Sequence, residues 1–283
     1  MSFNYDIIGF IKSLKQDAIG TVQEILVRRL ISPLISNIYN IKKESKLIDK
    51  ISLLTGKDHD FLLIMLLSAR FDVFQNAIKY VDIPGEIERV VAPSEYSYIW
   101  IPRVLGKSNI KIFYPYLRVG VHDTLKIFKS LKNFILIKDD KNILLNTTLP
   151  CSINKYILKY GLYKRSIIVY AQPHFPWISD IQLSQSLYRY VAINELVPGD
   201  IIQKVLKKSQ ISRKRVLKAY YLDMIYVLRC ISELIKYVKY NFNFDKIIIT
   251  GIHGELLGDY GFYLHKNFKL PQLILVPWYE VVI

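Results

Sequence analysis

The sequence predicts an α/β fold in which helices cover both faces of a mostly parallel sheet. From residue 61 onward, strand-length apolar runs alternate with stretches of helical periodicity. Apolar runs without polar alternation are typical of parallel strands that are buried on both faces. Residues 4–31 differ, because their apolar side chains recur only at helical spacing. We therefore expect a helical N-terminal extension over residues 1–56 and an α/β domain over residues 57–283.

The extension is expected to contain two helical stretches. Pro33 should interrupt the first, and the second should continue to about Leu53, where Gly56 closes it as a C-terminal cap. We expect the apolar face to pack on the sheet domain or to bind a protein partner. Binding to a membrane surface is a lower-ranked alternative. The basic residues of the segment favour membrane binding; they are Lys12, Lys15, Arg28 and Arg29. Its acidic residues oppose it; they are Asp6, Asp17 and Glu24.

The α/β domain is expected to contain strands at residues 61–67, 109–114, 166–170, 246–250 and 273–276. Its helices are expected at residues 71–80, 124–134 and 216–240. Ligands of such sheets bind at the carboxyl ends of the strands. Two histidines, His174 and His253, directly follow predicted strands, and His265 follows in the next loop. The sequence therefore places candidate functional residues at one edge of the sheet.

Charge and composition limit the classes of function. The chain has 283 residues and a net charge of +15, which suits an anionic small molecule or polymer. The same charge also fits a Lys-rich composition with no ligand behind it. The two cysteines make no disulfide framework, and the longest apolar runs are too short to cross a bilayer. We therefore expect a cytoplasmic protein.

Five segments, in order, resemble sulfatase-like hydrolases of the alkaline-phosphatase superfamily, especially archaeal members. The C-terminal segment resembles their strand and DHGE motif from Ile248 to Gly261 and their closing VPW strand at residues 273–281. Residues 169–178 and 219–228 are similar to their MQPHxPYI loop and AYxDN helix. Residues 67–74 stand where the family has DxxRYDxF, and residues 92–100 stand where it has a nucleophile loop. The resemblance implies an alkaline-phosphatase-like fold.

The resemblance also implies a metal-dependent site, but this sequence departs from the pattern. The nucleophile position falls on Ser97, and the histidine of the DHG motif is kept as His253, a candidate metal ligand. The two expected aspartate ligands are replaced by Leu67 and Ile252. Hard cations need oxygen ligands, usually with carboxylates among them. Without the metal, Ser97 would remain an unactivated hydroxyl.

Two hypotheses follow. The first is a catalytically degenerate protein, or pseudoenzyme, without a cofactor, which binds a phosphorylated or sulfated ligand or a protein partner. His174, His265 and Arg70 are its candidate substrate-binding residues, although Arg70 with Asp72 is also expected to form a structural ion pair. The alternative is an active phosphate- or sulfate-ester hydrolase with a rearranged site. There, His174, His253 and His265 would hold zinc or another divalent cation.

Other classes of function have less support. Residues 204–218 hold seven basic residues without an acid among them, which is typical of a solvated helix face. The run has no interleaved aromatic residues for base stacking, and no nucleic-acid-binding motif accompanies it. We therefore expect no nucleic-acid partner. The sequence also contains no Walker loop, no GxGxxG motif after a strand and no GxSxG elbow.

Overall fold

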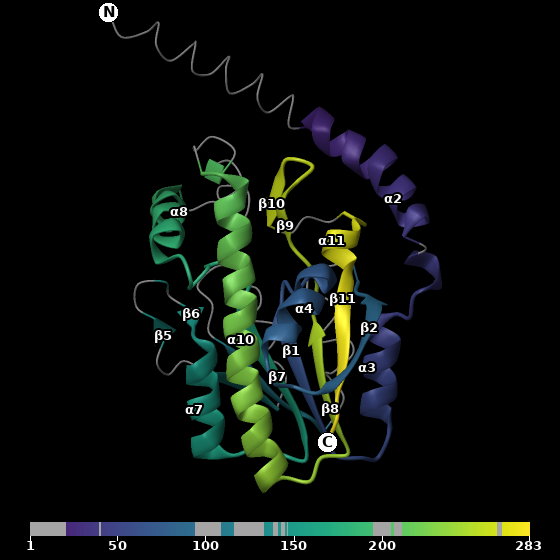
Figure 1. Cartoon of the computed structure of the whole chain (residues 1–283), viewed down its shortest axis with the longest axis vertical. Coiled ribbons are helices and arrows are strands. Elements are labelled where there is room, and N and C mark those ends of the chain that lie inside the picture. The colour runs from purple at the N-terminus through teal and green to yellow at the C-terminus, as the bar shows by residue number, and fades with distance from the viewer. Residues whose placement is uncertain are drawn as a thin grey trace, which may run out of the picture.

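The structure is a computed structural model (Figure 1). It describes residues 21–39, 41–93, 109–115, 133–137, 141–142, 145, 147–194, 205–206, 211–264 and 268–283. A seven-stranded sheet forms its centre. In spatial order the strands are β2 (Gly85–Val91), β11 (Leu275–Val281), β8 (Lys246–Gly251), β1 (Phe61–Leu67), β7 (Arg165–Pro173), β3 (Lys111–Pro115) and β4 (Phe134–Ile137).

The sheet is mostly parallel, as the sequence predicts. The five strands from β8 to β4 run parallel to their neighbours. Only β11 breaks the pattern, because it is antiparallel to both β8 and β2. Strand β1 lies at the centre, and all seven of its residues are buried. Its unbroken apolar run is what a strand needs when both faces are covered.

Helices cover both faces of this sheet. On one face, β1 residues Leu62, Ile64 and Leu66 belong to an apolar cluster with four helices, which are α4 (Phe71–Ala77), α7 (Pro150–Tyr160), α8 (Ile181–Asn194) and α10 (Arg213–Asn241). On the other face, Leu63 and Met65 pack in a second cluster with α3 (Leu47–Gly56). Figure 1 shows α10 in front of the sheet and α3 at its side. The α/β fold class is thereby confirmed.

The N-terminal part differs in detail from the prediction. Residues 21–38 form one continuous helical segment, which includes a π-helical stretch η1 (Val27–Ile31) and helix α2 (Ser32–Ile38). Pro33 does not interrupt it, because the backbone stays helical from the π-helical stretch through Ile31 into α2. A 3₁₀ turn η2 (Ile41–Lys43) leads to α3. Gly56 is the last residue of α3 and not its left-handed cap, since the extended Lys57 ends the helix. The division of the chain at residue 56 stays a prediction.

Several short elements complete the fold. They are the 3₁₀ turn η3 (Ile78–Tyr80), the helix α11 (Pro271–Ile274), and two small antiparallel pairs, β5 (Lys141–Asn142) with β6 (Thr147–Thr148) and β9 (Leu256–Asp259) with β10 (Phe262–Leu264). The strand expected at residues 273–276 begins later, at Leu275, because Pro271 starts the short helix before it. The helix expected at residues 124–134 lies almost wholly outside the described residues, but Phe134 begins strand β4.

Candidate functional site

The candidate site lies at the carboxyl ends of the adjacent central strands β8, β1 and β7. Leu67 ends β1 beside Pro173 of β7, and the backbone N–H of Ile252, just after β8, donates to the carbonyl of Leu66 at 2.9 Å. The side chains of Leu67 and Ile252, 4% and 0% exposed, belong to one buried cluster on the α3 face. We call Leu67 and Ile252 the apolar pair. The two residues that replace the expected aspartates are therefore ordinary parts of the hydrophobic core.

The described residues around the apolar pair do not fit a hard divalent cation. Leucine and isoleucine side chains offer no lone pair, whereas Mg²⁺ or Mn²⁺ requires several oxygen ligands. Within the ranges that the structure describes, no group of three histidine, cysteine or acidic side chains could hold a metal ion. No chemical step through such a cation can therefore be derived from this set of side chains.

Two candidate histidines do come together. The rings of His174 and His253 meet edge to face, with centroids 6.4 Å apart and planes at 84°. Each Nδ1 contacts the carbonyl of the following residue, Phe175 or Gly254. A carbonyl only accepts, so each neutral ring carries its proton on Nδ1 and its lone pair on Nε2. Ser97 and His265 lie outside the described residues, so their positions relative to this pair stay predictions.

Burial keeps both imidazoles neutral. Burial and, to a smaller extent, the neighbouring His253 lower the pKa of His174 to about 4, although the contact with the carbonyl of Phe175 acts to raise it. Burial also lowers the pKa of His253. Neutral imidazole is the form that can ligate zinc or accept a proton. A pair of neutral rings supplies two nitrogen ligands, fewer than the three protein ligands of a typical catalytic zinc site.

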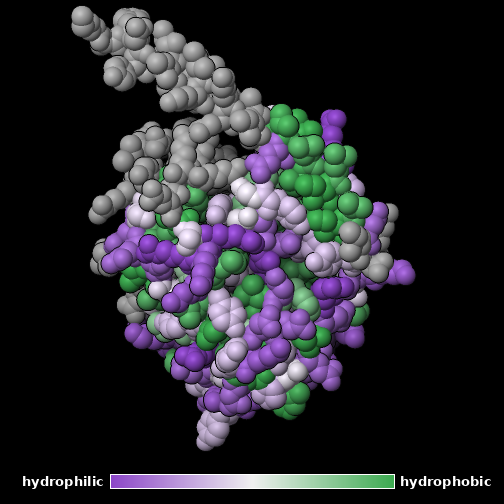
Figure 2. All heavy atoms as spheres, turned by 45° about the horizontal axis from the view of Figure 1, so that its top comes forward, coloured by the Kyte–Doolittle hydropathy of each residue, from purple (hydrophilic) through white to green (hydrophobic). Residues whose placement is uncertain are grey.

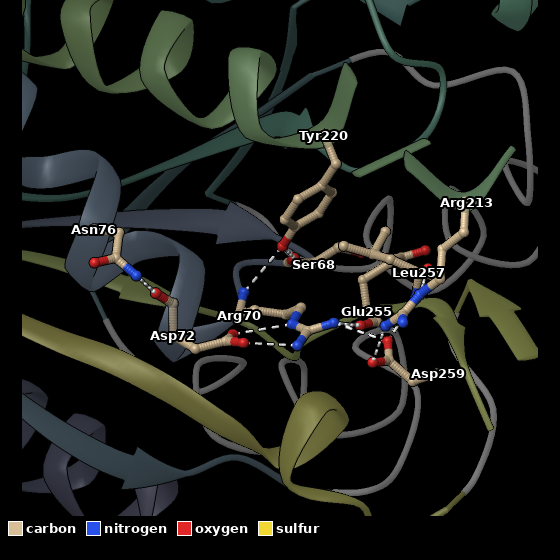
Figure 3. Close-up of polar contacts among 9 residues, drawn as sticks. All are labelled: Ser68, Arg70, Asp72, Asn76, Arg213, Tyr220, Glu255, Leu257 and Asp259. Carbon is tan, nitrogen blue, oxygen red and sulfur yellow. Dashed lines mark hydrogen bonds and ion pairs between the residues drawn. The ribbon is translucent and has the colours of Figure 1, made fainter. Parts of the chain in front are cut away.

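Arg70 belongs to a network of ion pairs on the other side of the same sheet edge (Figure 3). Its Nε and Nη2 donate to the two carboxylate oxygens of Asp72 at 2.9 and 2.7 Å, and its Nη1 donates to Asp259 at 2.9 Å. Arg213, at the start of α10, donates to the second oxygen of Asp259 at 2.9 Å. We call these four residues the Arg70 network. The expected ion pair between Arg70 and Asp72 is confirmed.

The environment holds the Arg70 guanidinium firmly charged. Burial alone would lower the pKa of Arg70, but the hydrogen bond and charge of Asp72, together with the charge of Asp259, raise it above the ordinary value. Its side chain is 8% exposed. An anionic ligand would have to compete with two carboxylates for this cation. The role of Arg70 in substrate binding stays a prediction.

Tyr220 connects α10 to the loop after β1. Its hydroxyl accepts a hydrogen bond from the backbone N–H of Arg70 at 3.0 Å and donates to the carbonyl of Ser68 (Figure 3). Ser68 adopts a φ of 62°, which is uncommon for a residue with a side chain. The tyrosine thus stabilises a strained turn at the point where β1 ends.

Glu255 is a buried acid next to the Arg70 network. Its side chain is fully buried, and neither carboxylate oxygen has a partner at hydrogen-bonding geometry in the described part of the chain. Burial raises its pKa to about 8, although the nearby Ser68 hydroxyl and the charge of Arg70 act to lower it. Asp259, in contrast, accepts from the backbone N–H of Leu257 at 2.9 Å and so orders its own strand.

The sequence analysis did not predict the long-range contacts of Arg213, Tyr220 and Asp259. Tyr220, Arg213 and Asp259 come from segments far apart in the chain, and no local pattern pairs them. Tyr220 lies in the segment that resembles the family's AYxDN helix, which was the available signal. Of the basic run at residues 204–218, Arg213 pairs with Asp259 and Arg215 pairs with Asp180.

Comparison with known proteins supports the fold only. No family model matches the chain, and no curated protein matches it. The solved structures similar to it include the C-terminal periplasmic domain of phosphoethanolamine transferase EptC from Campylobacter jejuni, at 14% identity, 78% and 79% coverage of the two chains and a TM-score of 0.46. The corresponding EptC domain of Escherichia coli, solved with zinc, shares 11% identity over 81% and 74%, with a TM-score of 0.48. A phosphonate monoester hydrolase from Silicibacter pomeroyi shares 11% over 80% and 68%, with a TM-score of 0.42.

The chain is similar to these structures in its α/β fold class, a mostly parallel sheet covered by helices. The expectation of a cytoplasmic protein is wrong by these comparisons, because the two EptC structures are periplasmic domains. Among the described helices, none is long and apolar enough to cross a membrane.

Proposed function

We propose that the protein is a non-hydrolytic binding protein with a sulfatase-like fold, which takes a phosphorylated or sulfated ligand, either free or carried by a protein partner. The observation that carries the proposal is the burial of Leu67 and Ile252 in one apolar cluster at the ends of β1 and β8. The positions where the resemblance implies carboxylate ligands are used for core packing.

The chemistry of ester hydrolysis explains why apolar residues at these two positions argue against catalysis. A divalent cation activates the nucleophile and neutralises charge on the transferring group, which stabilises the transition state by several kcal/mol. A serine hydroxyl at position 97 would have to attack without this help. The excess positive charge of +15 favours association with an anion but supplies no such activation.

A second candidate function is supported by the pair of imidazoles. His174 and His253 lie edge to face, and both present a proton at Nδ1 to a carbonyl. With His265 as a third ligand, they would form a zinc site in which zinc supplies Lewis-acid chemistry. This candidate ranks second because it needs a residue outside the described part of the chain.

Turnover of an aryl phosphate and an aryl sulfate separates the two functions. We expect rates at background with and without added Zn²⁺ or Mn²⁺, and the same background for the variants Ser97→Ala and His253→Ala. Binding of inorganic phosphate and sulfate, followed by calorimetry, should remain measurable in all three proteins. Zinc-dependent turnover that both substitutions abolish would establish the hydrolase instead. Absence of both turnover and anion binding would refute the proposed ligand class.

A further inference from the structure

The helical segment of residues 21–38 is anchored to the domain along one face. Val27 is 2% exposed and packs in a third apolar cluster with residues of β9 to β11, and Gln23 donates to the carbonyl of Tyr260 at 2.7 Å. The Arg28 guanidinium lies 5.8 Å from the centre of the Phe268 ring. These contacts fix which face of the helix points away from the protein.

The outward face is apolar. Five large aliphatic side chains on it are between 47% and 63% exposed: Val22, Ile25, Leu26, Leu30 and Leu34. Figure 2 shows a contiguous hydrophobic area at its upper right, the side on which Figure 1 places α2. Soluble proteins rarely expose aliphatic groups in such a continuous set unless the surface binds something.

The π-helical stretch keeps these side chains in line. Four of them recur every four residues, and in an α-helix each such step drifts by about 40° around the axis. The stretch Val27–Ile31 contains more residues per turn, so it corrects that drift between Leu26 and Leu34. The local geometry therefore converts a drifting pattern into a stripe along one side of the segment.

Charge decides among the partners that could cover the stripe. The chain has a net charge of +15, so two copies of it repel each other, whereas an anionic lipid surface attracts it. Arg28 and Arg29 are exposed on the same helix, and the exposed Lys43 and Lys46 follow it. Glu24, the one acid of the segment, pairs with Arg28 at 3.4 Å. An apolar face flanked by basic residues is the pattern of a helix that lies in a membrane interface.

We propose that the exposed stripe of residues 22–34 docks the protein on a lipid surface that contains anionic headgroups. The aliphatic side chains enter the boundary between headgroups and acyl chains, while Arg29, Lys43 and Lys46 contact the phosphates. This role does not depend on the proposed binding of a phosphorylated or sulfated ligand.

Vesicle co-sedimentation of the full chain tests the proposal. The natural protein should sediment with vesicles of phosphatidylcholine and phosphatidylglycerol, less with phosphatidylcholine alone, and less at high salt. The double variant Leu26→Glu with Leu30→Glu should bind about tenfold more weakly or worse, because binding scales with buried apolar area. The control is Leu158→Glu, the same type of substitution at a half-exposed leucine of α7. This variant should bind vesicles as the natural protein does.

Three results would overturn the proposal. They are no sedimentation with either vesicle, equal loss of binding in Leu158→Glu, and full binding by the double variant. Light scattering on the lipid-free proteins adds a further check. A dimer of the natural chain that the double variant loses, without any lipid binding, would assign the stripe to a second copy. Circular dichroism verifies that all variants are folded.

Discussion

The two sides of the sheet edge have opposite characters. On the α3 side, the apolar pair Leu67 and Ile252 continues the core to the very end of the strands. On the α10 side, the Arg70 network and Tyr220 join segments up to 189 residues apart through hydrogen bonds and ion pairs. Among the described residues, the apolar side offers no group of side chains that could hold a metal ion. The polar side keeps charged groups, but they bind one another. The edge as a whole is therefore organised for stability.

The largest effect should come from placing a charge on the apolar side. Ile252→Asp puts a carboxylate into a fully buried apolar cluster, where it has no partner. We expect the free energy of unfolding to fall by more than about 4 kcal/mol. The control Ile252→Val should cost about 1 kcal/mol. Chemical denaturation measures both, and an aspartate tolerated as well as the valine would mean that the site still accommodates a carboxylate.

The polar side should respond to loss of its central cation. Arg70→Met removes a buried guanidinium from two carboxylates, and we expect the free energy of unfolding to fall by about 3 kcal/mol. This value lies at the lower end of the range for broken buried ion pairs, because Arg213 still neutralises Asp259. Arg213→Met is the matched control. Its side chain is half exposed, so its removal should cost less than about 1 kcal/mol. Equal losses in the two variants would contradict the central place of Arg70.

Tyr220→Phe tests the neutral part of the polar side. The substitution leaves the N–H of Arg70 and the carbonyl of Ser68 buried without their partner. We expect the free energy of unfolding to fall by about 2 kcal/mol. Tyr237→Phe, on the same helix, should change stability by less than about 0.5 kcal/mol, because it removes a hydroxyl from a partly exposed ring. If the two variants unfold alike, the tyrosine does not stabilise the turn after β1.

The polar side should also make stability depend on pH. Asp223 of α10 accepts from the N–H groups of Ile178 and Ser179 at 2.8 Å each, and burial raises its pKa to about 7 against these bonds. A raised pKa adds stability below the unfolded value of 3.8, and that contribution is lost as the pH rises to about 7.

Comparison with Asp223→Asn isolates this effect. The natural protein's stability relative to the variant should fall by about 1 kcal/mol per pH unit between pH 4 and pH 7, and then level off. Other titrating groups, such as His174, are common to both proteins and cancel in the difference. A difference that stays constant over this interval would show that Asp223 keeps its ordinary pKa in the fold.

The sequence predicted the centre of the fold better than its edges. Residues 61–67 are apolar without interruption, so only a buried strand suits them, and β1 has those bounds. Strand β2 was missed because it lies at the edge, where its first five residues include Glu86, Glu88 and Arg89 and so look like a polar loop. The short helix before β11 was missed because tertiary packing, and not a periodic pattern, stabilises four residues.

The sequence predicted the contacts of the site only where the two partners are close together in the chain. Arg70 and Asp72 are two residues apart at a helix start, so their ion pair could be predicted from sequence. The sequence also shows apolar residues at positions 67 and 252, where the resemblance implies carboxylates. Asp259 and Tyr220 reach Arg70 and Ser68 through the tertiary fold, and a single sequence carries no signal for such pairs.

The most direct test of the account is equilibrium dialysis of the natural protein against Mn²⁺ and Zn²⁺, with the metal per chain determined by elemental analysis. The apolar pair leaves a hard cation without carboxylate ligands, so Mn²⁺ bound above the level of an unrelated basic protein is not expected. Zn²⁺ should likewise stay below one ion per chain. One tightly held Mn²⁺ or Zn²⁺ per chain, released by His253→Ala but retained by Leu158→Glu, would contradict the account and restore a metal-dependent site at the sheet edge.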